Sequence, residues 1–165
     1  MEGPDEGGEA ACALPLHGDV VEQLPDAALA QLVRDLADAV VVADRAGDVL
    51  LWNRGAERLL GWSADDMVGA PLDRIVPERL RARHDAGYHH TMETGETRYA
   101  DDLLQVPALH RDGHTVSVAF TVSLMWGPGQ KAPYAIAAVM RDDTERWELR
   151  RAADRAVRSA TTAAD

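Results

Sequence analysis

Apolar positions change their spacing several times along the chain, and each change predicts a new element. The first 25 residues are rich in Gly, Pro and acidic residues and show no sustained period, which is typical of a flexible tail. Apolar residues then recur at helical spacing behind Pro25-Asp26, which predicts a helix. The residues with this spacing are Leu29, Leu32, Val33 and Leu36. Two short apolar runs, 39–43 and 49–52, surround a Gly-containing turn and predict a β-hairpin.

The middle of the chain alternates polar caps with short apolar stretches. Asn53 and Gly61 are a typical start and end for one short helix, and Ser63 is a typical start for the next. The longest helical pattern there runs from Glu78 to Glu93 and ends at Thr94-Gly95. Three strand-like segments and a last helix follow, at 97–109, 115–124, 133–140 and from Asp143 onward. In the second of these strands, alternate apolar residues predict one buried face: Val116, Val118, Phe120, Val122 and Leu124.

The order of these elements predicts an α+β fold. Strands at both ends with short helices between them indicate a five-stranded antiparallel sheet that carries the helices on one face. We expect a tail at 1–25, a sensor domain with its N-terminal flanking helix at 26–146, and a C-terminal helix and tail at 147–165.

Several motifs, in this order, resemble those of the PAS family. They are Asp44-Arg45-Ala46-Gly47, Trp52-Asn53-Arg54-Gly55-Ala56-Glu57, Leu59-Leu60-Gly61-Trp62, Arg111-Asp112-Gly113, and the closing 139–146. The resemblance covers roughly 26–148 and implies a sensory rather than a catalytic protein. PAS domains bind heme, flavin, small acids or nothing, so this resemblance leaves the ligand open.

A narrower resemblance concerns the stretch 75–85, which contains Arg83-His84-Asp85. It is similar to a segment of heme-PAS oxygen-sensor kinases and of carbon-monoxide-responsive PAS regulators, in which a histidine is the proximal iron ligand. The resemblance implies that His84 ligates heme b and that a diatomic gas (oxygen, carbon monoxide or nitric oxide) is the signal. Oxygen-sensing relatives place an arginine on the following strand; alignment puts Leu104 near that position, so the choice of gas stays open.

The predicted helix around His84 has a face compatible with a macrocycle. Leu80, Gly87 and Tyr88 fall on the same side as His84. Glycine inside a helix costs about 1 kcal/mol relative to alanine, so Gly87 suggests a close approach of a flat ligand. Cations that could bind heme carboxylates are Arg81, His90 and Arg98. The opposite wall of the pocket is expected to come from Tyr99, Leu104, Val118, Phe120 and Val122.

Two other functions remain open from the residues alone. His84 can be an ordinary core histidine of a cofactor-free dimerisation or docking module, or the same cavity can hold a small organic metabolite. His84, His89 and His90 point to different sides of a helix, which disfavours a zinc site among them. His110 and His114 flank a turn, and we expect both to be solvated.

Composition narrows the classes of partner. The net charge of −11 disfavours binding to nucleic acid or to anionic membranes. The acidic N-terminus and the lack of a long apolar run predict a cytoplasmic protein, and the single Cys12 excludes an intramolecular disulfide. No phosphate-binding loop or nucleophile motif is apparent, so we expect no enzymatic activity. Apolar stripes on both terminal helices favour a homodimer, mainly through the N-terminal stripe, with output to a separate signalling protein.

Overall fold

The computed structural model describes residues 24–97, 99–100 and 102–162. They fall into two compact units that meet at Leu32–Val33. Helix α2 (Asp26–Asp35) runs across this boundary, and every other element belongs to the second unit. Cys12 and most of the predicted tail lie outside the described residues. The predicted first helix is confirmed, although Leu36 lies just beyond its end.

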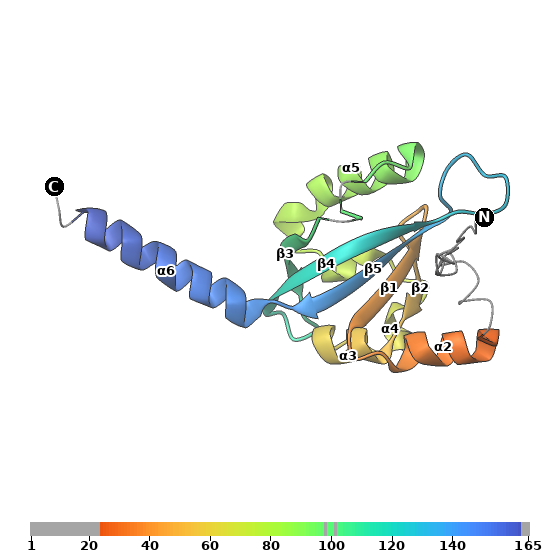
Figure 1. The fold of residues 1–165 in the computed structure, drawn as a ribbon, viewed down its shortest axis with the longest axis horizontal. Coiled ribbons are helices and arrows are strands. Elements are labelled where there is room, and N and C mark those ends of the chain that lie inside the picture. Colours follow the sequence, from red (N-terminus) through yellow and green to blue (C-terminus); the bar gives the residue numbers. More distant parts are fainter. Residues whose placement is uncertain (1–23, 98, 101, 163–165) are drawn as a thin grey trace, which may run out of the picture. The chain divides into compact units, whose positions relative to one another are not determined.

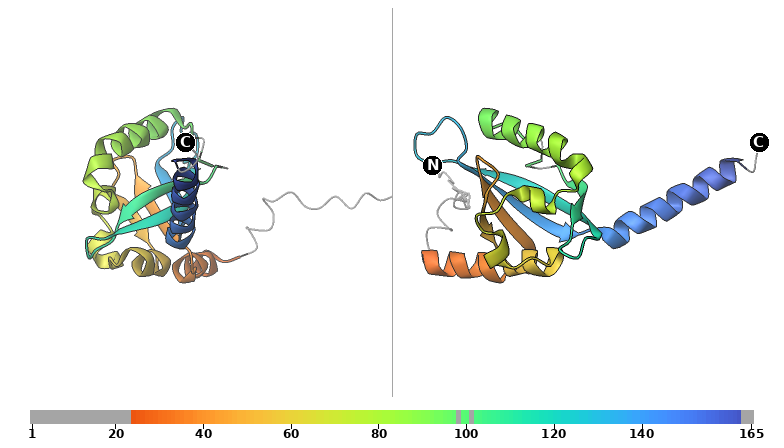
Figure 2. Two further views of the ribbon diagram at one scale, coloured as in Figure 1. Left: turned by 90° about the vertical axis from the view of Figure 1, so that its left-hand side faces the viewer. Right: turned by 180° about the vertical axis from the view of Figure 1, so that it is seen from behind.

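The second unit is built on one antiparallel sheet of five strands in the order β2-β1-β5-β4-β3. The strands are β1 (Ala39–Asp44), β2 (Val49–Trp52), β3 (Leu104–Leu109), β4 (Thr115–Met125) and β5 (Ala135–Asp142). The helices are α3 (Arg54–Leu60), α4 (Ala64–Met67), the 3-10 helix η1 (Leu72–Ile75), α5 (Glu78–Thr94) and α6 (Thr144–Thr162). The helices between β2 and β3 cover one face of the sheet (Figure 1 and Figure 2). The predicted α+β architecture is confirmed.

One predicted strand is shorter than the sequence pattern suggests. The segment 97–109 was expected to be strand-like, whereas β3 begins only at Leu104. Residues 99–100 form a turn, and the Tyr99 carbonyl accepts a hydrogen bond from the Val122 N–H at 2.9 Å. This bond holds the segment beside β4 without extending the ladder.

The predicted buried face of β4 is confirmed as far as Val122, whereas Leu124 is only partly buried. Val116, Val118 and Val122 are buried, and Phe120 packs against the same core while partly exposed. Register places Phe120 between Leu104 of β3 and Met140 of β5. The helix-covered face of the sheet therefore presents an apolar surface that runs across its three C-terminal strands.

Asn53 joins several segments at the start of α3. Its side-chain Oδ1 accepts hydrogen bonds from the N–H groups of Ala56 and Val40, at 2.9 and 2.8 Å. Its Nδ2 donates to the carbonyls of Val33 and Asp38, each at 3.0 Å. The side chain is 3% exposed, so its hydrogen-bonding groups are satisfied inside the protein. The predicted cap thus also ties α3 to the chain that leads into β1.

Helix α6 starts from a fixed point at the end of β5. The N–H of buried Asp143 donates to the Ser117 carbonyl, and the Ser117 N–H donates to the Thr144 hydroxyl. Arg150, two turns into the helix, donates to the Asp143 carboxylate at 2.9 Å. Among the described residues, no helix is both long and apolar enough to cross a membrane.

Candidate functional site

Helix α5 carries the predicted ligand residue and is held mainly by one narrow stripe. It follows Pro77, whose fixed φ suits a helix start, and it ends at Gly95, whose φ is 72°. Tyr88 and Met92, one turn apart, are its buried residues. With Ala43 of β1 they form a small core cluster, against which Leu72 and Ile136 pack. Because few side chains of α5 are buried, much of its surface is free for other contacts.

Tyr88 fixes the helix to the first strand. Its hydroxyl donates a short hydrogen bond to the Asp44 carbonyl. Burial raises the pKa of the Tyr88 phenol well above its usual range, and the carboxylates of Asp44 and Asp48 add to this effect. The phenol therefore stays protonated, as a donor to the carbonyl requires. In the structure Tyr88 is a core and anchoring residue, a role that sequence reasoning did not assign to it.

His84 lies one turn before Tyr88 and is half-buried, with 35% of its side chain exposed. The two rings are 5.8 Å apart between centroids and tilted by 32°. His84 Nδ1 lies 3.3 Å from the Asp85 carboxylate. A proton on Nδ1 shared with this carboxylate leaves Nε2 with its lone pair, the form in which imidazole binds a metal.

A second carboxylate approaches from the 3-10 helix. One ligand atom each of Asp73, His84 and Asp85 lie within 4.8 Å of one another, and all three residues are partly buried. The Arg-His-Asp motif already places Asp85 beside His84 in the sequence. No sequence signal identifies Asp73, because its approach depends on how η1 packs near α5.

Four of the five residues predicted for the opposite wall share one face of the sheet. Leu104 pairs with Phe120 across β3 and β4, and Val118 and Val122 lie two residues to either side of Phe120 on the same face. Val118 and Val122 are buried, whereas Leu104 and Phe120 are partly buried. Tyr99 lies in the turn before β3, with its carbonyl bound to Val122. The four strand residues form a continuous apolar surface, and its role as the wall of a ligand pocket stays a prediction.

The remaining predicted residues of α5 are placed differently. Leu80 is partly buried, but Gly87 and His90 are exposed. A side-chain carbon added at Gly87 would meet no atom within 4 Å, so the protein itself supplies no packing reason for this glycine. Arg81 donates through Nε to the Val76 carbonyl at 3.2 Å. Arg98 lies outside the residues that the structure describes.

Heme needs an axial ligand, apolar walls and cations near its carboxylates. His84 fits as the ligand, because its ring is accessible and already faces an orienting carboxylate. The face around Phe120 fits as a wall. The cations fit less well: Asp73 and Asp85 flank His84, Arg81 bonds to a backbone carbonyl, and exposed His90 lies about 240° around the helix from His84.

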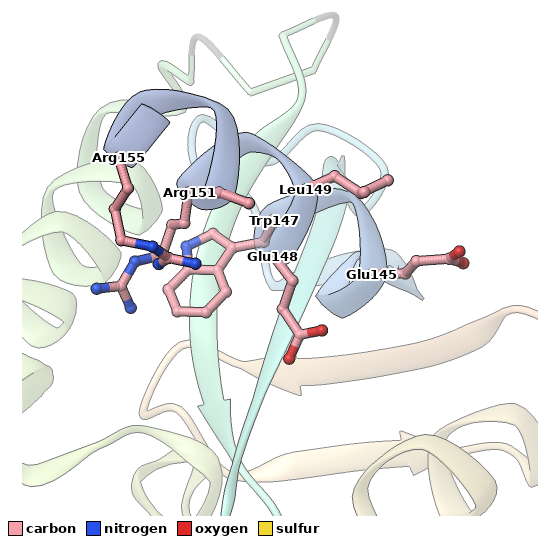
Figure 3. A pocket seen from close by; sticks show the side chains of 7 residues that line it. Glu145, Trp147, Glu148, Leu149, Arg151 and Arg155 are labelled. Carbon is pink, nitrogen blue, oxygen red and sulfur yellow. The ribbon is translucent and has the colours of Figure 1, made fainter. Parts of the chain in front are cut away.

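A separate hollow lies on α6 and contains none of the predicted site residues (Figure 3). Side chains of that single helix line it: Glu145, Trp147, Glu148, Leu149, Arg151, Ala152 and Arg155. The Arg151 guanidinium lies 4.6 Å from the centre of the Trp147 ring, a cation–π arrangement. This hollow is a feature of an exposed helix surface, lined by charged side chains together with Trp147, Leu149 and Ala152.

The family model described as the PAS fold matches residues 27–142. The chain belongs to the PAS family. This match confirms the family resemblance drawn from the hairpin and helix-cap motifs, and it covers all five strands of the sheet.

Three relatives share the PAS domain but are much longer proteins. An uncharacterized protein of Azorhizobium caulinodans is 33% identical over 119 residues, covering 72% of this chain and 16% of the relative. The sensor protein FixL of Bradyrhizobium diazoefficiens is 30% identical over 117 residues, covering 71% of this chain and 23% of FixL. The oxygen sensor protein DosP of Escherichia coli is 24% identical over 99 residues, covering 60% and 12%. The chain thus spans less than a quarter of each relative.

Solved PAS structures share the fold at lower identity. The PAS domain of a Colwellia psychrerythraea protein superposes with a TM-score of 0.61 at 23% identity, covering 77% of this chain and 99% of that one. The PAS domain of the Cronobacter turicensis quorum-sensing receptor RpfR, solved in complex with BDSF, gives 0.53 at 14% identity, covering 67% and 97%. These likenesses support the PAS fold and leave the ligand of this PAS domain to its own residues.

Proposed function

We propose that this PAS domain is a heme-based gas sensor in which His84 is the proximal ligand. The observation that carries the proposal is the position of His84 on α5, accessible, beside the Asp85 carboxylate and one turn from the anchored Tyr88. The likeness to FixL and to the oxygen sensor protein DosP supports the same function.

Each side chain of the site has a defined part in this function. Heme b, when bound, supplies the iron that binds oxygen, carbon monoxide or nitric oxide. Asp85 orients the His84 ring, as carboxylates commonly do for metal-bound histidines. Tyr88 fixes the position of α5 against β1 and so the position of His84. Val118, Phe120 and Val122 exclude water from the gas-binding side.

Output would pass along the sheet to α6. Asp143 and Thr144, at the start of α6, hydrogen-bond to Ser117 of β4. Ser117 is adjacent to Val118, which lies on the proposed wall. A change in packing at Val118 would therefore act on a strand that directly holds the output helix, and it would bias the orientation of that helix.

The test is heme titration of the purified protein with and without His84. We expect a one-to-one complex with a Soret band, and in the His84→Ala variant a shifted band with weaker binding. His89→Ala is the matched control, because His89 is an exposed histidine on the same helix. A Soret band and affinity unchanged by His84→Ala would overturn the proposal.

A second candidate function follows from the carboxylates beside His84. Asp73 and Asp85 make the region acidic, and Tyr88 belongs to the core, an arrangement compatible with a small organic metabolite or with no cofactor at all. The complex of the RpfR PAS domain with BDSF is an example of an organic ligand on this fold. Native mass spectrometry of freshly purified protein separates the three cases by the added mass of heme, of a metabolite or of nothing.

We further propose that the domain acts as a homodimer and signals to a separate protein. The described part of α6 is exposed beyond Thr144, and its large apolar side chains Leu149 and Val157, eight residues apart, lie on the same side of the helix. Exposed apolar residues at helical spacing are typical of a helix that pairs with another. Sedimentation of the wild type against a Leu149→Glu/Val157→Glu variant tests this, and a dimer that survives both charges would rule out pairing through α6.

A further inference from the structure

The turn between β3 and β4 places two histidines side by side. His110 and His114 close the hairpin: the His110 N–H donates to the His114 carbonyl, and the Gly113 N–H donates to the His110 carbonyl, both at 2.9 Å. Their rings stack at 4.2 Å between centroids with 24° between planes. The expectation that both are solvated is wrong for His110, of which only 17% of the side chain is exposed.

His110 is buried because the turn packs against the end of α3. Gly61 caps α3 with a φ of 76°, and a side-chain carbon on it would lie 2.5 Å from the His110 ring. The Arg111 N–H donates to the Leu60 carbonyl at 3.0 Å, and the Arg111 guanidinium lies over the Trp62 ring. These contacts come from a segment about 50 residues earlier in the chain, and they fix the ring before any ligand binds.

The nitrogen of His110 that faces the turn carries a lone pair. Its Nδ1 accepts a hydrogen bond from the Asp112 N–H at 3.1 Å and lies 3.5 Å from the Asp112 carboxylate. Because this nitrogen has a single lone pair, a metal ion bound there replaces the hydrogen bond, and the exposed Asp112 N–H turns to water. The carboxylate and the His114 ring complete a group of donors, since one ligand atom each of His110, Asp112 and His114 lie within 4.8 Å of one another. Two imidazoles and a carboxylate are a donor set suited to zinc and similar ions.

We propose that His110, Asp112 and His114 bind a divalent transition-metal ion of the zinc class at the β3–β4 turn. Ligand atoms about 2.1 Å from a tetrahedral ion lie about 3.4 Å apart, so the donors must close by about 1.4 Å at most. Asp112 and His114 are exposed and can rotate to do so, while His110 stays seated on Gly61. Water fills the fourth position, and bound metal links the two strands across their turn.

This site is independent of the heme proposal. The other group of possible metal ligands among the described residues, Asp73, His84 and Asp85, lies at the candidate cofactor site and offers two oxygens and one nitrogen. Harder ions prefer such an oxygen-rich set, whereas two imidazoles favour zinc, nickel or copper. Variants at the two places therefore distinguish them.

The experiment is zinc titration by calorimetry on the untagged, metal-free chain of residues 1–165, with Co²⁺ absorption as a second readout. We expect one site, and a loss of affinity of at least about tenfold in His114→Gln and in Asp112→Asn. Both side chains are exposed, so far-ultraviolet circular dichroism should show an unchanged fold. His89→Gln is the matched control, an exposed histidine that should bind zinc like the wild type.

Imidazole proton resonances separate ligation from nonspecific binding. Zinc should shift the ring signals of His110 and His114 together, and these shifts should disappear in His114→Gln. His84→Ala should retain the site, and His114→Gln should retain any Soret band. The proposal is overturned if His114→Gln and Asp112→Asn bind zinc like the wild type, or if His84→Ala is the variant that loses it.

Discussion

Helices α3 and α5 each contain an internal glycine, and the two glycines have opposite surroundings. A side-chain carbon at Gly55 of α3 would collide with the backbone carbonyls of Ala37 and Asp38. The same carbon at Gly87 of α5 would meet nothing within 4 Å. Helix α3 is thus packed against another part of the backbone, whereas α5 touches the sheet along one stripe. Helix α3 therefore serves mainly to stabilise the fold, whereas α5 keeps an accessible face around His84.

This difference shows where the PAS domain can tolerate amino-acid substitutions. Around α3 the polar groups of Asn53 are satisfied within the protein and the backbone contacts leave no space. Around α5 a histidine, two carboxylates and a glycine remain wholly or partly accessible. Ligand binding and its evolution are easier on α5, because substitutions there cost the fold less.

The largest effect is expected for Gly55→Ala. The added methyl group must displace the Asp38 carbonyl, which also accepts a hydrogen bond from Asn53, so we expect a loss of about 3 kcal/mol in the free energy of unfolding. Urea denaturation measures it. Gly87→Ala is the matched control. It should raise the free energy of unfolding by up to about 1 kcal/mol, since alanine favours helices and the site is open. Equal effects of the two substitutions would contradict the contrast.

The second-largest effect is expected for Asn53→Ala, which should lower the free energy of unfolding by about 2 kcal/mol. The substitution removes the acceptor of the Val40 and Ala56 N–H groups and leaves buried polar groups without partners. Asn53→Asp keeps the acceptor but sets a buried carboxylate oxygen against the Val33 and Asp38 carbonyls, so its midpoint in urea should also lie below that of the wild type. A variant with the midpoint of the wild type would show that the cap contributes little.

Tyr88→Phe should cost about 1 kcal/mol near neutral pH, the value of one buried hydrogen bond. The raised pKa of Tyr88 adds a dependence on pH. Tyr88 contributes fully to the free energy of unfolding below a pH of about 10, the pKa of tyrosine in an unfolded chain. The contribution falls as the pH rises above that value, because only the tyrosine of the unfolded chain then ionises. The free energy of unfolding should therefore fall less between pH 8 and pH 10.5 in Tyr88→Phe than in the wild type. A steeper fall in the variant would contradict the assignment.

The smallest loss of stability is expected for Gly87→Leu, within about 1 kcal/mol of the wild type. The open surroundings of Gly87 accept the side chain without displacing protein atoms. If heme lies against this face of α5, the same substitution should weaken heme binding, as measured by Soret titration. Unchanged heme affinity in a well-folded variant would place the macrocycle elsewhere.

Much of the fold could be predicted because its signals are local. Asn53 and Gly61 bracket α3 through contacts within a few residues, and the period of two along β4 identified Val116, Val118 and Val122 as buried. The start of β3 was predicted too early, because apolar residues before Leu104 have strand-like composition but enter a turn at 99–100. Composition cannot distinguish a strand from a segment that merely runs beside one.

The candidate site was predictable in part. His84 was predicted from its motif and its helix face, Phe120 and Val122 from alternation along β4, and Leu104 from alignment with the motif that follows it. The part of these residues in binding a ligand stays a prediction. Asp73 was missed, and the outward position of His90 was not anticipated as a difficulty for cation contacts. Rotation about a helix follows from sequence spacing, but the element that approaches each face does not.

The sequence by itself determined the order of the elements, their capping residues and the residues on the buried face of β4, because these depend on neighbours within about four residues. Only the tertiary structure decided that Gly55 contacts another stretch of backbone, that Asp73 lies near His84, and that His110 packs against Gly61. Those contacts join segments that are far apart along the chain. Their closeness results from the packing of the whole sheet and its helices, and no local pattern contains it.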